Sequence, residues 1–284
     1  MAKQRFSSPE TEERCRTCLE EFHSYLDFQN KSANTIRAYL FTVRQFYELY
    51  PTINTENMLL YKCYLIDHYK PQTVNLRIRA MNCFQEFLNL PATRLLMVRY
   101  QRRPFLENVI SQADYEYLKN CLLRDGKTNY YFAVRIMAGT GLRISELIQL
   151  QVKDIQQGYV DLYSKGNRMR RVYIPKNIRR PCLKWLIASD RTTGYIFLNR
   201  SGERITANGI RNQLCYFASI YNLDPTVVHP HSFRHLFAKN FIEHCSDIAM
   251  LSDILGHESI ETTRIYLHRS STEQQQIFNQ VVNW

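Results

Sequence analysis

The C-terminal part of the chain gathers side chains that could carry out phosphoryl chemistry. It reads His229-Pro230-His231-Ser232-Phe233-Arg234-His235, then Leu255-Gly256-His257, then Thr262-Thr263-Arg264-Ile265-Tyr266-Leu267-His268. A tyrosine hydroxyl is a poor nucleophile at neutral pH because its ordinary pKa is about 10. Tyr266 would therefore need cations and proton-transfer groups close by, and this segment supplies both. The grouping indicates attack by a tyrosine on a phosphodiester.

A further cluster lies upstream, in Thr140-Gly141-Leu142-Arg143-Ile144-Ser145-Glu146-Leu147. A pentacoordinate phosphorus carries negative charge on its non-bridging oxygens, which suits the forked donors of Arg143 and Arg234. A base must accept the tyrosine proton and an acid must protonate the leaving 5′-oxygen, and His231 and Lys165 are the candidates. A phosphotyrosine would conserve the bond energy, so neither a cofactor nor a metal is expected.

The elements that must position these residues divide the chain into two expected domains. Apolar residues recur at helical spacing over 10–50 and 57–90, with Asn34 as the expected cap of one helix. Residues 1–100 should form an all-helical unit of about four helices. Residues 101–284 should form the second domain, mostly helical, with strands at 159–163 and 171–175. The fold class is mainly α with a small antiparallel β-sheet.

Basic side chains lie on several of these elements. Arg37, Arg44, Arg77 and Arg79 stand off the apolar stripes of the second and fourth helices, where a solvated face is the simple alternative. The segment from Arg94 to Pro104 is basic and is expected to be an interdomain linker placed against phosphates. The turn between the two expected strands carries Lys165, Arg168 and Arg170.

Taken in order, these motifs resemble those of the tyrosine recombinase and phage integrase family. By that resemblance, the catalytic residues would be Arg143, Lys165, His231, Arg234, His257 and the nucleophile Tyr266. The resemblance also implies that Glu146 orients Arg143 and that His235 supports the site without being a catalyst. Six family positions in order over residues 143–266 leave little room for chance.

The resemblance implies further expectations about DNA and assembly. A core-binding domain and a catalytic domain would clamp a double-stranded DNA recombination site, and the arginines expected to face DNA are Arg37, Arg44, Arg77, Arg79, Arg102, Arg103, Arg168 and Arg170. Four protomers on two paired sites would act through a Holliday junction and exchange their C-terminal helices. That helix carries an apolar stripe within 277–284, for which packing on its own domain is the alternative. The enzyme would be Xer-like or transposon-encoded.

Two rival functions stay open at this point. A type IB topoisomerase would use the same chemistry on one duplex, and an accessory DNA-binding protein would keep the fold without catalysis. A binding protein has no need of His231, Lys165 and Tyr266 together. The sequence names neither the target site, nor accessory proteins, nor the outcome among integration, excision, resolution and inversion.

Composition agrees with a polyanionic partner. Over 284 residues, 37 Lys and Arg face 26 Asp and Glu, which gives a formal charge of +11. Eight scattered cysteines favour reduced thiols, and the lone pair Cys15 and Cys18 with His23 beyond it is weak evidence for zinc. With no apolar run of about 18 residues and no signal peptide, the expected location is the bacterial cytoplasm, associated with the nucleoid when bound.

Overall fold

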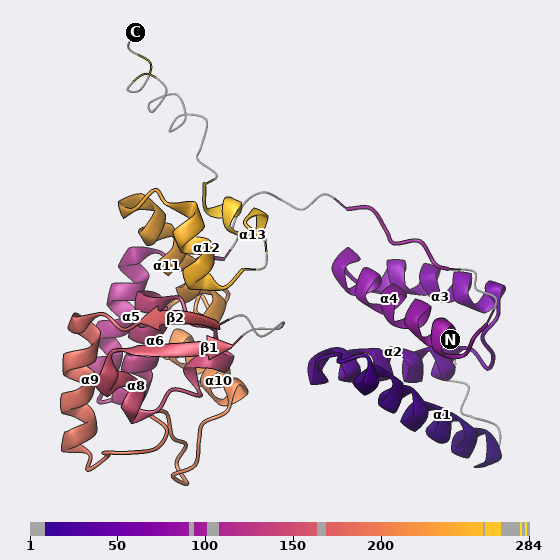
Figure 1. Cartoon of the computed structure of the whole chain (residues 1–284), viewed down its shortest axis with the longest axis horizontal. Coiled ribbons are helices and arrows are strands. Elements are labelled where there is room, and N and C mark those ends of the chain that lie inside the picture. The colour runs from indigo at the N-terminus through magenta and orange to yellow at the C-terminus, as the bar shows by residue number, and fades with distance from the viewer. Residues whose placement is uncertain are drawn as a thin grey trace. The chain divides into compact units, whose positions relative to one another are not determined.

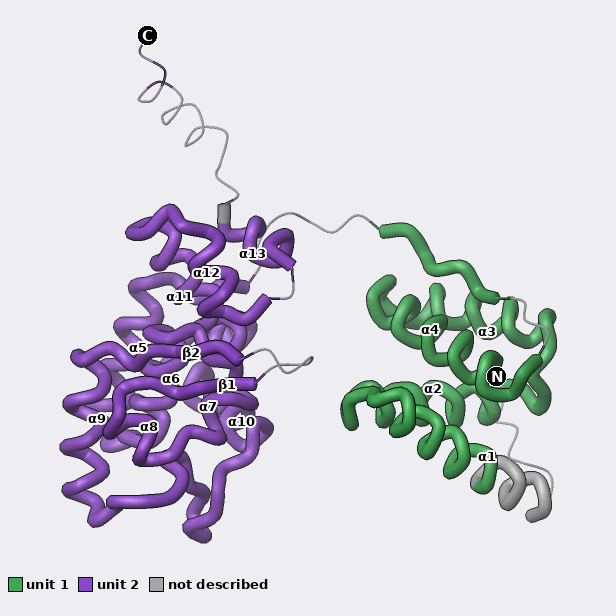
Figure 2. Tube along the Cα trace, viewed as in Figure 1, with its two compact units in different colours: residues 1–102 green, residues 103–284 purple. Residues whose placement is uncertain are grey.

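The computed structural model describes residues 9–90, 94–100, 108–163, 169–257 and 259–267, together with 279 and 282, and side chains from Thr17 onward. The chain separates into two compact units, residues 1–102 and 103–284 (Figure 2). Each unit has its own hydrophobic core. No described helix combines the length and the apolar character that a membrane span needs.

Unit 1 is a four-helix unit. Its helices are α1 (Pro9–Phe28), α2 (Ala33–Leu49), α3 (Thr55–His68) and α4 (Pro71–Phe87). Ser32 caps α2, because its extended backbone lets the hydroxyl accept from the Thr35 amide at 3.3 Å. The expectation that Asn34 caps this helix is wrong, since Asn34 already lies in its first turn. Pro71 opens α4, where its missing N–H costs nothing.

The core of unit 1 is rich in aromatic rings. Phe22, Phe46, Tyr61 and Phe84 are fully buried, and α2 packs on α4. Arg77, on α4, is buried as well, so the expectation that it stands out from the helix is wrong. Its guanidinium lies over the rings of Phe41 and Tyr69 and donates to the side-chain oxygen of Gln45.

Two asparagines of α4 hold the segment that follows unit 1. Asn82 exchanges two hydrogen bonds with the backbone of Leu95, both at 3.0 Å. Asn75 does the same with Val98, at 2.8 and 2.9 Å. The side-chain amides thus satisfy the backbone N–H and C=O groups that a neighbouring strand would otherwise bond. The start of the expected linker therefore belongs to unit 1. Arg102 and Arg103 lie outside the described residues.

Unit 2 combines helices with a two-stranded sheet (Figure 1). Its elements are α5 (Gln112–Arg124), α6 (Thr128–Thr140), α7 (Ile144–Leu147), α8 (Val152–Gln157), β1 (Tyr159–Tyr163), β2 (Met169–Tyr173), α9 (Lys176–Ala188), α10 (Ala207–Ile220), α11 (Pro230–His244), α12 (Ile248–Leu255), α13 (Glu261–Arg264) and the 3-10 helix η1 (Ile265–Leu267). The strands pair antiparallel with Tyr159 opposite Tyr173. The second strand begins at Met169, two residues earlier than expected. Lys165 and Arg168 lie outside the described residues.

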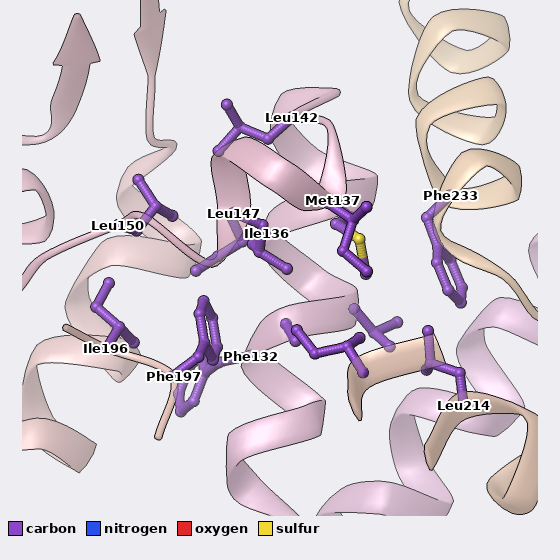
Figure 3. Packing of buried hydrophobic residues seen from close by; sticks show 14 of the residues in the cluster. Phe132, Ile136, Met137, Leu142, Leu147, Leu150, Ile196, Phe197, Leu214 and Phe233 are labelled. Atoms are coloured by element: carbon purple, nitrogen blue, oxygen red, sulfur yellow. The ribbon is translucent and has the colours of Figure 1, made fainter. Parts of the chain in front are cut away.

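Helix α6 runs through the centre of unit 2. Phe132, Ile136 and Met137 on this helix are buried (Figure 3). Helices α5, α9 and α11 pack against it. Because α6 is held on several sides, its C-terminal end is a fixed platform for the residues that follow Thr140.

The first described residues of unit 2 are tied to α11. The backbone N–H of Ile110 donates to the Ser232 hydroxyl at 2.6 Å, and both residues are buried. This bond joins the point where the chain enters unit 2 to the residue that follows His231.

Candidate active site

Two helices that end on glycine bring the first motifs together. Helix α6 ends at Gly141 and α12 at Gly256, and both glycines have a positive φ, +68° and +62°. A Cβ on Gly141 would lie 2.6 Å from the ring of Phe237, and one on Gly256 would overlap the guanidinium of Arg170. Both turns therefore require glycine, for the backbone angle and for space.

The carbonyls at these turns hold the two candidate phosphate-binding arginines. Arg234 donates to the carbonyls of Gly141 and Leu255, each at 2.6 Å. Arg143 donates to the carbonyl of Gly256 at 3.0 Å. Motifs more than ninety residues apart in the sequence thus fix one another through backbone oxygens.

One carboxylate, Glu146, lies among the arginines. It accepts from the Arg143 side chain at 3.1 Å, from the Arg143 backbone N–H at 2.8 Å and from Arg170 at 2.8 Å. The contact expected between Glu146 and Arg143 is present. Arg170 was expected on the turn, facing DNA, but it lies in β2 with its side chain only 10% exposed. That expectation is wrong, because the residue points inward to Glu146.

The site carries an excess of buried positive charge. Burial, and then the charge of Arg143, lower the pKa of Arg234 to about 10. Burial also lowers the pKa of Arg170. An arginine side chain stays charged in proteins, so three arginine charges stand beside the carboxylate of Glu146. An anion held here would relieve this imbalance.

His257 lies beside Arg234. Its Nε2 is 3.1 Å from the Arg234 guanidinium, and its Nδ1 is 2.8 Å from the Thr263 hydroxyl. Burial, followed by the charges of Arg234 and Arg143, lowers the pKa of His257 to about 4. The ring is therefore neutral at physiological pH.

The candidate nucleophile contacts a histidine other than the expected base. The Tyr266 hydroxyl is 2.7 Å from Nδ1 of His235. Burial raises the pKa of Tyr266 to about 12, and burial with the charge of His231 lowers that of His235 to about 4. His235 is thus a neutral imidazole that can accept the hydroxyl proton. His231 is exposed at the start of α11, and desolvation and His229 lower its pKa.

The structure brings most, though not all, of the predicted site together. Arg143 and Glu146 are hydrogen-bonded to each other, as are Arg234 and His257, and His235 and Tyr266. The Tyr266 hydroxyl also interacts electrostatically with Arg234. Arg37, Arg44 and Arg79 are exposed on α2 and α4 of unit 1. Sequence reasoning missed Thr263 and also Arg211, an exposed residue of α10 whose charge lowers the pKa of His231. Among the described residues, no group of three His, Cys, Asp or Glu side chains is placed to hold a metal ion.

The chain matches the phage integrase family over residues 108–273, more than half of its length. It therefore belongs to that family. The relatives are tyrosine recombinases. XerA of Pyrococcus furiosus is 28% identical over 257 residues, which cover 87% of this chain and 88% of that protein. XerC of Escherichia coli O157:H7 is 34% identical over 140 residues, which cover 48% of this chain and 47% of XerC.

Solved structures show the same fold. An integrase of the transposon Tn1549, in complex with transposon right end DNA, has a TM-score of 0.72 at 16% identity and covers 93% of this chain and 99% of its own. The XerH site-specific recombinase bound to its substrate in a post-cleavage complex has a TM-score of 0.71 at 16% identity, covering 98% and 90%. These likenesses confirm the expected fold class, mainly α with a small antiparallel sheet.

Proposed function

We propose that this protein is a site-specific DNA recombinase that cleaves and rejoins strands through a covalent bond between Tyr266 and a 3′-phosphate. One observation carries the proposal. Arg143, Arg170 and Arg234 form a cationic site around the carboxylate of Glu146. The Tyr266 hydroxyl, 2.7 Å from Nδ1 of the neutral His235, interacts electrostatically with Arg234 of that site. Such a site fits the transition state of phosphoryl transfer better than it fits a neutral substrate.

The proposed reaction balances without an external energy source. Arg143 and Arg234 bind the non-bridging oxygens of the phosphate, and Glu146 keeps Arg143 in place. The Tyr266 oxygen attacks phosphorus and its proton passes to His235, while the bond to the 5′-oxygen breaks. Lys165 supplies the proton that this oxygen gains. Rejoining runs the same steps in reverse with a 5′-hydroxyl from the partner strand.

The contact between Tyr266 and His235 revises the expected assignment of the base. His231 was expected to take the tyrosine proton, but in this structure His235 touches the hydroxyl at 2.7 Å. We assign His235 as the first acceptor and His231 as a ligand of the phosphate, which its exposed position beside the arginines permits.

The nucleophile is tested with a nicked suicide substrate, which traps the covalent complex. Tyr266→Phe removes one oxygen and little packing, so DNA affinity and folding are retained while the denaturation-resistant protein–DNA adduct disappears. Tyr221→Phe is a matched control, since that tyrosine also donates a hydrogen bond, to Asp125, but lies outside the site. An adduct formed by the Tyr266 variant would refute the assignment.

The role of Lys165 is tested through the leaving group, because a bridging 5′-sulfur departs without needing a proton. The sulfur substrate should restore cleavage by Lys165→Ala and leave Arg143→Ala inactive. If neither variant is restored, Lys165 binds DNA and does not protonate the leaving oxygen.

Assembly as four protomers on two paired sites, with exchange of the C-terminal helix, is part of the same proposal. The residues of that helix, 272–284, lie outside the described residues apart from 279 and 282. Deletion of 274–284 should leave binding to a single site nearly intact and abolish pairing of two sites on a native gel. A large fall in the melting temperature of the free truncated protein would instead indicate that the helix packs on its own domain.

The arginines proposed to bind DNA are those that are exposed or lie outside the described residues: Arg37, Arg44, Arg79, Arg102, Arg103 and Arg168. Contacts to phosphates release counterions, so replacing each by alanine should reduce the salt dependence of binding by about one unit of slope per contact. A variant that changes affinity on one site sequence only would mark a base contact.

A further inference from the structure

The hydrogen bonds of His257 define where its proton lies. Arg234 approaches Nε2 at 3.1 Å, and a guanidinium has only donors, so Nε2 must be the acceptor. The ring is neutral, since burial and two arginines lower its pKa to about 4. The single ring proton is therefore on Nδ1, which donates to the Thr263 hydroxyl at 2.8 Å.

This tautomer is the wrong one for a phosphate ligand. An imidazole can donate to a phosphate oxygen from Nε2 only if Nε2 carries the proton. In the free protein that position accepts from Arg234 instead. His257 must therefore exchange its tautomer before it can stabilise a phosphorane, and the group bonded to Nδ1 must tolerate both forms.

Thr263 meets that requirement. It is fully buried in α13, and a hydroxyl can accept one hydrogen bond and donate another by rotating about a single bond. Its backbone is fixed, because its N–H donates to the carbonyl of Ile260 at 2.8 Å. Thr263 also lies three residues before Tyr266, so the same short segment holds the histidine and carries the nucleophile.

We propose that Thr263 is a positioning residue that lets His257 switch from the Nδ1–H to the Nε2–H tautomer when a phosphate binds. The inference rests on the proposed function. Arriving phosphate draws Arg234 away from Nε2. One proton then leaves Nδ1 to water and one reaches Nε2 from water, with no net change in charge. The Thr263 hydroxyl rotates from acceptor to donor and holds the ring in place.

The tautomer is measured directly, by ¹⁵N NMR of histidine-labelled protein, with His257→Gln to assign the resonance. The free protein should show the Nδ1–H form. Tyr266→Phe bound to an uncleaved DNA site should show the Nε2–H form. An Nε2–H ring in the free protein, or an Nδ1–H ring that persists in the complex, would overturn the proposal. This readout needs no activity, so it separates a failure here from a failure of the recombinase assignment, which would appear as a wild type that forms no adduct.

Two substitutions test the hydroxyl itself. Thr263→Val keeps the shape and removes the hydroxyl, so cleavage at saturating DNA should slow by at least roughly tenfold, as losses of residues that orient a catalytic histidine commonly do. Thr263→Ser keeps the hydroxyl and should cleave within about threefold of wild type. If valine is tolerated equally well, or if serine fails as badly as valine, Thr263 contributes packing alone and the proposal is wrong.

Discussion

Two buried arginines, one in each unit, sit in contrasting surroundings. Arg77 in unit 1 lies over the ring of Tyr69, 3.9 Å from its centroid, and near that of Phe41 at 5.3 Å, and it donates to the amide oxygen of Gln45. Arg234 in unit 2 faces two backbone carbonyls and a histidine nitrogen. Both are less than a tenth exposed.

The surroundings differ in what they leave unsatisfied. Two aromatic rings and the side-chain oxygen of Gln45 contact the guanidinium of Arg77. Arg234 shares its site with Arg143, Arg170 and the carboxylate of Glu146, and burial, followed by the charge of Arg143, lowers its pKa to about 10. A buried arginine whose hydrogen bonds and charge are satisfied by its neighbours has a structural role. One that lies beside further cations favours the binding of an anion.

Alanine substitution of each arginine tests whether Arg234 acts in catalysis and Arg77 in stability. The largest effect is expected at Arg234. Arg234→Ala should lower the rate of covalent complex formation by several hundredfold, because loss of one transition-state donor is typically worth about 3 to 4 kcal/mol. Arg77→Ala should instead lower the free energy of unfolding of unit 1 by about 1 to 3 kcal/mol through lost stacking and hydrogen bonds. The two measurements are a single-turnover assay at saturating DNA and urea unfolding. A cleavage defect for the Arg77 variant that persists at saturating DNA would end the distinction.

Replacement of His235 tests whether the arginine cluster or the tyrosine contact limits the rate. His235→Ala removes the acceptor at the Tyr266 hydroxyl, and we expect cleavage to fall by roughly 10²-fold, the usual scale for a lost general base. His235→Asn keeps a polar atom near the position of Nδ1 and should lose less. If His231→Ala abolishes proton transfer while His235→Ala does not, His231 is the base as the sequence first indicated.

Two histidines of unit 2 should make its stability depend on pH. His235 and His257 have folded-state pKa values of about 4, below the ordinary value of about 6.5. Between these values the unfolded chain binds more protons, so stability is present above pH 6.5 and is lost as the pH falls toward 4. Melting curves at pH 7.5 and 5 measure the loss. The double variant His235→Asn, His257→Gln should show a smaller difference between the two.

The smallest effect is expected at the asparagine contacts of unit 1. Asn82→Ala removes two hydrogen bonds to Leu95, at a cost of about 1 to 2 kcal/mol that falls on the segment alone. Amide hydrogen exchange at Leu95 should accelerate while amides inside α4 stay protected. Asn75→Ala should do the same at Val98, and unchanged exchange at both amides would show that another contact holds the segment.

The sequence predicted the family and the fold class, because the residue types and order of the motifs are restricted by the chemistry that the family carries out. Arg143, Arg234 and His257 converge as expected, and the apolar spacing located the helices. The sequence could not show that the side chains of Arg77 and Arg170 are buried. A long arginine side chain can extend into water or fold back against neighbouring residues, and the sequence pattern is the same in both cases. The choice between His231 and His235 depends on the position of Tyr266, which comes from a different segment. Asn75 and Asn82 stand seven residues apart, a spacing that places both on one face of a helix. That spacing was the available signal that both bond the segment after unit 1's last helix.

The hydrogen bond between Ile110 and Ser232 couples the backbone at the start of unit 2 to helix α11. The chain is held upstream at Leu95 and Val98, and downstream at the hydroxyl of the residue after His231. A displacement of the backbone at Ile110 would therefore be passed through the Ser232 hydroxyl to the first turn of α11, the helix that carries both Arg234 and His235.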